Sequence, residues 1–300
     1  MKEKIVLEHL NSQTENPARV VILGAKGFVG ATTHAQLKQA GVPVLALGRQ
    51  DLDLLADGAG AKLAGLLKSE DSLLVISAQA PVKDNVMLEN NIRMMSAVCE
   101  ALSEVTPAHV VYVSSDAVYA DSPGPLSETS CAQPDSLHGI MHLAREVMLK
   151  NAYEGPLGLI RPTLIYGVND PHNGYGPNRF RRFAAEGQEI VLFGEGEERR
   201  DHVLVDDVAQ LIVGMLTHKS QGVLNAATGV VTSFKDIAKM VVAHFENPPV
   251  ISGSPRVGTM PHDGYRPFDP VATIAAFPGF TYVTLVDGIA QAHKDMMEKS

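Results

Sequence analysis

The stretch that decides the fold is RVVILGAKGFVG, residues 19–30. An apolar, β-branched run typical of a buried strand stops at Gly24, and a helical pattern begins near Gly30. In a dinucleotide-binding loop, Gly24 would permit a tight turn, Gly27 would let backbone N–H groups approach a pyrophosphate, and Gly30 would let the helix pack on the strand. We therefore expect the three glycines and Phe28 to contact a dinucleotide. The alternative is a glycine-rich turn that binds no ligand.

The alternation of strand and helix continues along the chain. The expected strands are Arg19–Leu23, Pro43–Leu47, Leu73–Ser77, His109–Ser114 and Leu157–Arg161, and the expected helices are Gly30–Ala40, Asn91–Val105 and Leu137–Asn151. Such alternation predicts an α/β protein with a Rossmann-like, doubly wound parallel sheet. We expect residues 20–23 and 110–114 to be neighbouring strands. The apolar face expected for the last of these helices consists of Leu137, Ile140, Met141, Ala144, Val147 and Met148.

Composition divides the chain into three segments. Residues 1–18 are a polar leader, and residues 19–165 form the dinucleotide-binding domain. After residue 165 the sequence changes to Gly, Pro, Asn and charged residues, so residues 166–300 are expected to form a smaller α/β lobe that binds substrate. Parts of 201–228 can pack back on the main sheet. The last helix is expected to begin near Ser233.

The overall charge limits the choice of partner. The chain has 300 residues and a net charge of -9, with its lysines and arginines scattered singly, so it has no electrostatic footprint for nucleic acid or an anionic membrane. No apolar stretch reaches the roughly 18 residues of a membrane span. Cys99 and Cys131 lack the neighbours of a disulfide framework or a thiolate zinc site. We expect a cytoplasmic protein with a small-molecule substrate, able to pair as a homodimer.

Cofactor choice depends on the end of the second strand. An acid there binds a ribose 2′-hydroxyl, whereas a cation accommodates a 2′-phosphate. Gly48 stands where the acid is expected, and Arg49 follows it. Arg49 therefore favours NADP over NAD, and Asp51 is the residue that would reverse this preference. The alternative for Arg49 is a plain surface cation.

Four further motifs stand in order along the chain: VSSDAVY at 113–119, RPTLIYG at 161–167, RDHVLVDDV at 200–208 and NAATG at 225–229. With the glycine loop, they resemble the extended short-chain dehydrogenase/reductase family over about residues 19 to 290. That family contains nucleotide-sugar epimerases, dehydratases and reductases. The resemblance implies an NAD(P)-dependent enzyme acting on a nucleotide sugar or a similar polar carbonyl compound.

The motifs also supply candidate site residues. Ser115 and Asp116 follow an apolar strand, at the carboxyl end where an open α/β sheet builds its site. A serine hydroxyl there can bond a substrate oxygen, and a carboxylate can move a proton. The alternative is a capped loop, which also favours Ser and Asp. The resemblance further implies that Arg200, and more weakly Arg266, bind the diphosphate of a nucleotide sugar.

The sequence departs from the family at its signature YxxxK. Residues 134–146 read PDSLHGIMHLARE, so that His138 replaces the tyrosine acid/base and His142 replaces the lysine that lowers the tyrosine pKa and holds the nicotinamide ribose. A histidine exchanges protons near neutral pH without a lysine, so we expect the rate to follow a group titrating at about pH 6 to 7. Helical geometry predicts that both histidines lie beside the apolar stripe.

Two alternatives to this enzyme remain. In the first, the chain is a cofactor-binding pseudoenzyme or regulatory binding protein without hydride transfer. In the second, His138, His142 and Glu146 bind zinc, because two histidines four residues apart have the spacing of helical zinc sites. However, Gly139 stands where a helical metalloprotease has its glutamate base, and the family pattern already accounts for Glu146. We therefore expect no metal site.

Overall fold

The computed structural model describes residues 6–298, and within that range seven strands form the central sheet in the order β1-β10-β6-β5-β4-β2-β3. These strands are β1 (Leu7–His9), β2 (Val20–Leu23), β3 (Val44–Leu47), β4 (Ser72–Val75), β5 (His109–Val113), β6 (Leu157–Pro162) and β10 (Ser220–Ala226). Neighbouring strands are parallel except for β1, which pairs antiparallel with β10. The expected doubly wound parallel sheet is confirmed.

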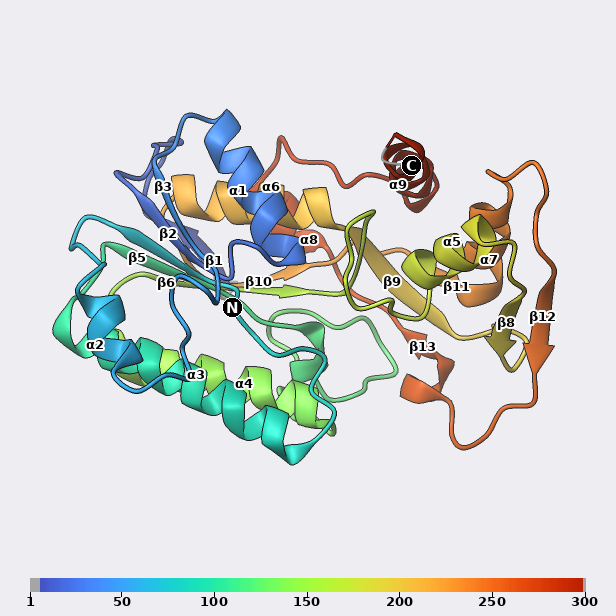
Figure 1. The fold of residues 1–300 in the computed structure, drawn as a ribbon, viewed down its shortest axis with the longest axis horizontal. Coiled ribbons are helices and arrows are strands. Elements are labelled where there is room, and N and C mark those ends of the chain that lie inside the picture. The colour runs from blue at the N-terminus through green and yellow to red at the C-terminus, as the bar shows by residue number, and fades with distance from the viewer. Residues whose placement is uncertain (1–5, 299–300) are drawn as a thin grey trace, which may run out of the picture.

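Helices cover both faces of this sheet (Figure 1). One face carries α1 (Phe28–Gln39) and α6 (Val205–Thr217), and the other carries α2 (Ala59–Ala64), α3 (Asn85–Glu104) and α4 (Leu137–Ala152). Because both faces are covered, every residue of β2, β4 and β5 is buried, as parallel strands require. No helix in the described part of the chain is both long and apolar enough to cross a membrane.

The expected pairing of residues 20–23 with residues 110–114 is wrong. Strand β4 lies between β2 and β5, and β2 pairs with β3 on its other side. The parallel part of the sheet therefore starts at β2, adds β3 on one side and then reverses to add β4 and β5 on the other. This reversal is a topological switch point, which places a crevice beyond the carboxyl ends of β2 and β4.

Both ends of the chain differ from what the sequence predicts. Residues 1–5 of the expected leader lie outside the described residues, but residues 7–9 form strand β1 at the edge of the main sheet. The helix near Ser233, α7 (Phe234–Val242), is not the last, because α8 (Val271–Ala276) and α9 (Leu285–Met297) follow it. The signal for α9 is the capping residue Thr284, which accepts the Asp287 N–H.

A smaller group of elements lies beyond the main sheet (Figure 1). It comprises β7 (Leu164–Tyr166), α5 (Pro177–Ala185), β8 (Ile190–Phe193), β9 (Arg199–Leu204), β11 (Val231–Ser233), α7, β12 (Ile251–Ser254) and β13 (Tyr265–Arg266). Helix α6 and strand β10, which lie between these elements in sequence, pack with the main sheet. The parallel pair β9–β13 places Arg266 opposite Arg200.

Helix α4 does not bury the face that its apolar residues predict. Its buried residues are Gly139, Met141, His142, Arg145, Glu146 and Leu149. Ile140 is 42% exposed and Val147 is 56% exposed. The reason is a polar network under the helix, in which Glu146 accepts two hydrogen bonds from Arg161 and one from Ser114. The helix turns its charges inward to complete that network and leaves apolar side chains on the surface.

Candidate functional site

The glycine loop is shaped by close approaches of the backbone. Gly24 has a φ of +95°, and a Cβ atom on it would lie 2.8 Å from the Ser77 nitrogen. A Cβ atom on Gly30 would collide with the carbonyl oxygen of Gly24, so helix and strand pack as closely as the sequence predicts. Gly27 is the N-cap of α1 and contributes no side chain, which leaves the helix N-terminus open toward an anion. These residues fit a dinucleotide pyrophosphate.

Phe28 has a different environment. A Cβ atom on Gly167 would lie 3.1 Å from the Phe28 ring, and the ring borders a small depression that Val205 also lines. Its side chain is therefore turned toward the segment after β7. The part of Phe28 that remains near the loop is its backbone, in the first turn of α1.

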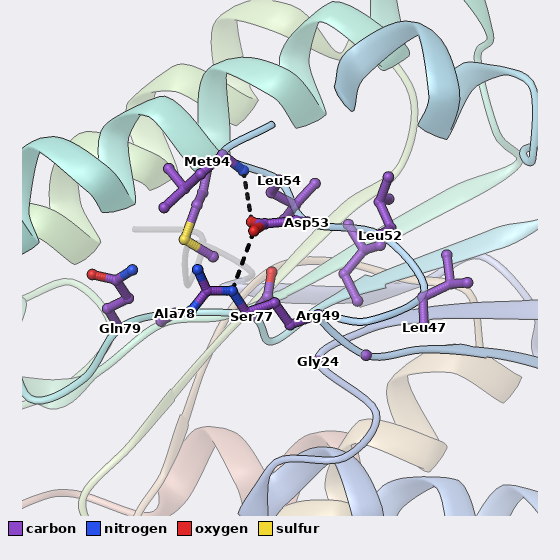
Figure 2. Close-up of a pocket in the computed structure, with 13 residues that line it drawn as sticks. Gly24, Leu47, Arg49, Leu52, Asp53, Leu54, Ser77, Ala78, Gln79 and Met94 are labelled. Carbon is purple, nitrogen blue, oxygen red and sulfur yellow. Dashed lines mark hydrogen bonds and ion pairs between the residues drawn. The ribbon is translucent and has the colours of Figure 1, made fainter. Parts of the chain in front are cut away.

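A cavity of about 250 Å³ lies beyond β2 and β4, at the switch point. Figure 2 shows its apolar side chains, which include Leu47, Leu52, Leu54 and Met94, with Gly24 below them. Its size, its apolar lining and its position beside the glycine loop suit the adenosine end of a dinucleotide.

The charged lining of this cavity is a pair of residues, Arg49 and Asp53 (Figure 2). Arg49 Nε lies 3.3 Å from Asp53 Oδ2, and Asp53 also accepts the Leu55 N–H at 3.1 Å. The Leu55 N–H and then Arg49 hold the pKa of Asp53 below its usual value. Sequence reasoning identified Arg49 but missed Asp53. No local signal separates Asp53 from Asp51, because each aspartate is followed by a leucine.

Asp51, the residue that would reverse the preference for NADP, is engaged elsewhere. Its carboxylate accepts the Gly48 N–H at 2.8 Å and lies 3.4 Å from Lys26 Nζ. These two contacts, led by the Gly48 N–H, hold the pKa of Asp51 below its usual value. The Lys26 side chain crosses Gly48, since a Cβ atom there would lie 2.8 Å from it. Lys26 and Arg49, both positively charged, therefore flank Gly48, the position where an NAD-binding acid is expected.

The N-terminus of α4 packs against the loop that carries Ser115 and Asp116. A Cβ atom on Gly139 would collide with the Ala117 carbonyl oxygen, so glycine is required for this approach. The fold thus brings His138 beside the loop. Ser115 Oγ accepts the Ala117 N–H at 3.1 Å and donates to Asp116 Oδ1 at 3.3 Å. Ser115 is therefore also the capping residue that the alternative interpretation expects.

His138 is half-buried, and its Nδ1 accepts a long hydrogen bond from the Val82 N–H at 3.5 Å. Burial lowers the pKa of His138, Asp116 opposes this effect, and His172 adds to it. The expected titration at about pH 6 to 7 is thus shifted below 6.5. At neutral pH the uncharged form of His138 therefore prevails. Its lone pair is on Nδ1, so this nitrogen can act as a general base only by releasing the long hydrogen bond from the Val82 N–H.

His142 is only 6% exposed, so the expectation that it lies beside the buried face is wrong. Its Nδ1 lies 2.8 Å from the Tyr112 hydroxyl, and its ring meets the His138 ring edge-on with centroids 4.7 Å apart. The reason is that α4 packs with its polar side over β5, which supplies Tyr112. Glu146 is held by Arg161 and Ser114, so its carboxylate is already engaged.

A second cavity, of about 270 Å³, brings together Asp116, Arg200 and Arg266. The Asp116 carboxylate lies 3.8 Å from Arg200 and 3.5 Å from Arg266. Its neighbour Arg199 instead covers the Tyr265 ring with its guanidinium 4.7 Å from the ring centroid. Alternation along β9 therefore turns Arg200 toward the cavity.

Two further residues of this cavity, Asp121 and His262, were not predicted. His262 Nδ1 lies 2.5 Å from Asp121 Oδ1, and Arg266 also pairs with Asp121. No local sequence signal identifies them, because His262 reaches the cavity only through the pairing of β13 with β9. Both arginines therefore have acidic partners inside the cavity.

Comparison with known proteins gives concordant results. A profile of the NAD dependent epimerase/dehydratase family matches residues 20–227. The UDP-glucose 4-epimerase of Mycolicibacterium smegmatis is 30% identical over 250 residues, 73% of this chain and 80% of that protein. The dTDP-L-rhamnose 4-epimerase of Burkholderia thailandensis is 31% identical over 140 residues, 43% of this chain and only 38% of that protein.

Among solved structures, the UDP-glucose 4-epimerase of Thermus thermophilus in complex with NAD has a similar fold. Its TM-score is 0.83 at 21% identity, and the match covers 94% of this chain and 100% of that chain. Profile, sequence relative and fold agree with the glycine loop, the switch-point cavity and the order of the motifs. The chain therefore belongs to the NAD-dependent epimerase/dehydratase family.

Proposed function

We propose that this protein is an enzyme that uses a nicotinamide dinucleotide to convert a nucleotide sugar or a similar polar carbonyl compound, with His138 in the place of the usual tyrosine. The position of His138 carries this proposal. His138 accepts a hydrogen bond from the Val82 N–H, and Val82 comes three residues after the segment Ser77–Gln79, which lines the first cavity. In the sequence His138 comes two residues after Ser136, which lines the second cavity. His138 therefore lies close to segments that line both cavities, although it lines neither itself.

Each part of the site has a proposed task. The backbone of Gly24, Gly27 and Gly30 holds the pyrophosphate, and a bound dinucleotide supplies the hydride chemistry. Neutral His138 releases the Val82 N–H and takes a proton from a substrate hydroxyl at Nδ1, and the imidazolium that forms returns that proton. Ser115 hydrogen-bonds the same substrate oxygen, and the carboxylate of Asp116 stabilises the imidazolium that forms at His138.

The dinucleotide is expected to be NADP(H), and the reason is Arg49. This side chain is 75% exposed, and among residues 6–298 its one ion pair is the exposed pair with Asp53, so it can turn to a 2′-phosphate and make charge-assisted hydrogen bonds. We expect NADP(H) to bind roughly tenfold more tightly than NAD(H), and Arg49→Ala to remove the difference.

Calorimetric titration with both dinucleotides measures this preference. Arg93→Ala is the matched control, because Arg93 is also exposed but lies outside the cavity. Equal or tighter binding of NAD(H) by the unaltered protein would refute the role of Arg49. Binding of neither dinucleotide would refute the site itself.

For the substrate, we propose that Arg200 and Arg266 receive a diphosphate, and that they exchange Asp116 and Asp121 for phosphate oxygens when it binds. The sequence relatives, which are named as nucleotide-sugar epimerases, support this choice.

A thermal-shift screen of nucleotide sugars, with and without NADP(H), tests the proposal. A ligand that binds the folded state raises its apparent stability, so at least one nucleotide sugar should raise the unfolding midpoint. No shift with any of them would contradict the diphosphate site.

We also propose that the exposed apolar face of α4 pairs with a second copy of the chain. Ile140 and Val147 lie two turns apart on this face, and a two-fold axis brings identical faces together. Val147→Glu should weaken the dimer by roughly 100-fold, since it buries an unpaired charge in an apolar contact. Sedimentation equilibrium measures this. Val257→Glu is the control, because Val257 is 95% exposed and distant in the chain. A monomeric unaltered protein would rule out the pairing.

A further inference from the structure

The inference concerns Tyr112, a buried residue of β5 that makes contact with neither cavity. Its hydroxyl lies 2.8 Å from Nδ1 of His142, and in the described part of the chain no other group bonds to that hydroxyl. If Nδ1 carried a hydrogen and donated it to Tyr112, the tyrosine hydrogen would be buried without an acceptor. Tyr112 therefore donates, and the lone pair of Nδ1 accepts.

Tyr112 keeps its hydrogen under all ordinary conditions. Burial raises the pKa of Tyr112 to about 12, so the hydroxyl remains a donor at neutral pH. When Nδ1 accepts, the single ring hydrogen of a neutral histidine must be on Nε2. The geometry of this one hydrogen bond thus fixes both the tautomer and the ring orientation of His142.

The surroundings of His142 also oppose a positive charge on it. Arg145, one turn along α4, is fully buried, and its guanidinium lies 5.2 Å from the centre of the Tyr112 ring. Arg145 donates to the carbonyl oxygen of Ser77 at 2.8 Å, and this uncharged partner does not neutralise the guanidinium. The positive charge of Arg145 therefore disfavours a second positive charge on His142. Burial, His138 and Arg145, in that order, hold the pKa of His142 well below its usual value. His142 is therefore neutral.

We propose that Tyr112 is a positioning residue that holds His142 as the neutral Nε2–H tautomer, so that position 142 offers one fixed N–H donor to a ribose hydroxyl of the dinucleotide. The ribose contact rests on the proposed function, whereas the tautomer belongs to the protein without ligand. On this account, the fixed positive charge in this part of the helix is carried by Arg145 instead of by residue 142.

The tautomer is tested by long-range ¹H–¹⁵N correlation spectra of the ligand-free protein. His142 should show an unprotonated Nδ1 and a protonated Nε2, and both signals should stay unchanged as the pH falls through the ordinary histidine value near 6.5, where a free histidine titrates. Tyr112→Phe removes only the hydroxyl, and the His142 nitrogen signals should then move toward the values of mixed tautomers. Tyr153→Phe is the matched control, because Tyr153 is also buried but donates to the Pro107 carbonyl, at 2.8 Å. It should leave the His142 signals in place.

The ribose contact is tested by titration of the same three proteins with NADP(H). Tyr112→Phe should weaken binding by about two- to tenfold, and Tyr153→Phe should leave it within about twofold. A protonated Nδ1 in the unaltered protein, or His142 signals that Tyr112→Phe does not move, would overturn the proposal. Unchanged affinity despite a changed tautomer would overturn the ribose contact. If no protein binds NADP(H), the proposed function fails while the tautomer assignment stands.

Discussion

Replacing His138 with alanine should lower turnover of the nucleotide sugar identified by the screen by about two to four orders of magnitude. This is the usual loss when a general acid/base is removed. Dinucleotide affinity should stay nearly unchanged, because the glycine loop and Arg49 lie on other elements. In the unaltered protein the rate should fall as the pH drops through a value below 6.5, because the neutral form of His138 is needed and burial lowers its pKa.

Steady-state kinetics over a range of pH measures both effects. His244→Ala is the matched control, because His244 stacks on His293 near α7 and α9 and lines neither cavity. Its rate and pH profile should match those of the unaltered protein. If His138→Ala retains full turnover, the proton role passes to Asp116.

The largest effect on stability is expected at the ion pair under α4. Arg161 and Glu146 are both buried, with Arg161 nitrogens 2.8 and 2.6 Å from the two carboxylate oxygens. Arg161→Met leaves a buried carboxylate without its partner, so the free energy of unfolding should fall by about 3 to 5 kcal/mol. The double variant Arg161→Met/Glu146→Leu removes both charges and should regain most of that loss.

Urea unfolding of the single and double variants measures this coupling. Lys150→Ala is the control, because the partly exposed Lys150 lies 3.9 Å from Glu146, and its loss should cost less than about 1 kcal/mol. Equal losses in the single and double variants would mean that the two side chains do not stabilise the fold as a pair.

The sequence predicted the dinucleotide half of the fold because its signals are local. The glycine loop is read from adjacent residues, and the structure places Gly24 and Gly30 in the close approaches that their lack of a side chain predicts. The expected pairing of residues 20–23 with residues 110–114 was wrong because long-range contacts decide which strands are neighbours in a sheet. The sequence of residues 72–75 carries no local signal that this strand lies between β2 and β5.

The errors on α4 have a different physical cause. Periodicity assigns apolar residues to the inside, but the buried carboxylate of Glu146 needs Arg161, and this requirement overrides the apolar stripe. His142 is buried for the same reason. Residues such as Asp121 and His262 could not be found from the sequence, because they meet only after β13 pairs with β9.

The most direct test of the account is whether the protein changes a nucleotide sugar. The unaltered protein, with NADP(H) present, would be incubated with each nucleotide sugar that raised its unfolding midpoint, and the sugar would be followed by NMR. We expect at least one sugar to be epimerised, dehydrated or reduced, and His138→Ala to convert it far more slowly. Binding of dinucleotide and sugar without any conversion would contradict the account and identify the protein as a pseudoenzyme.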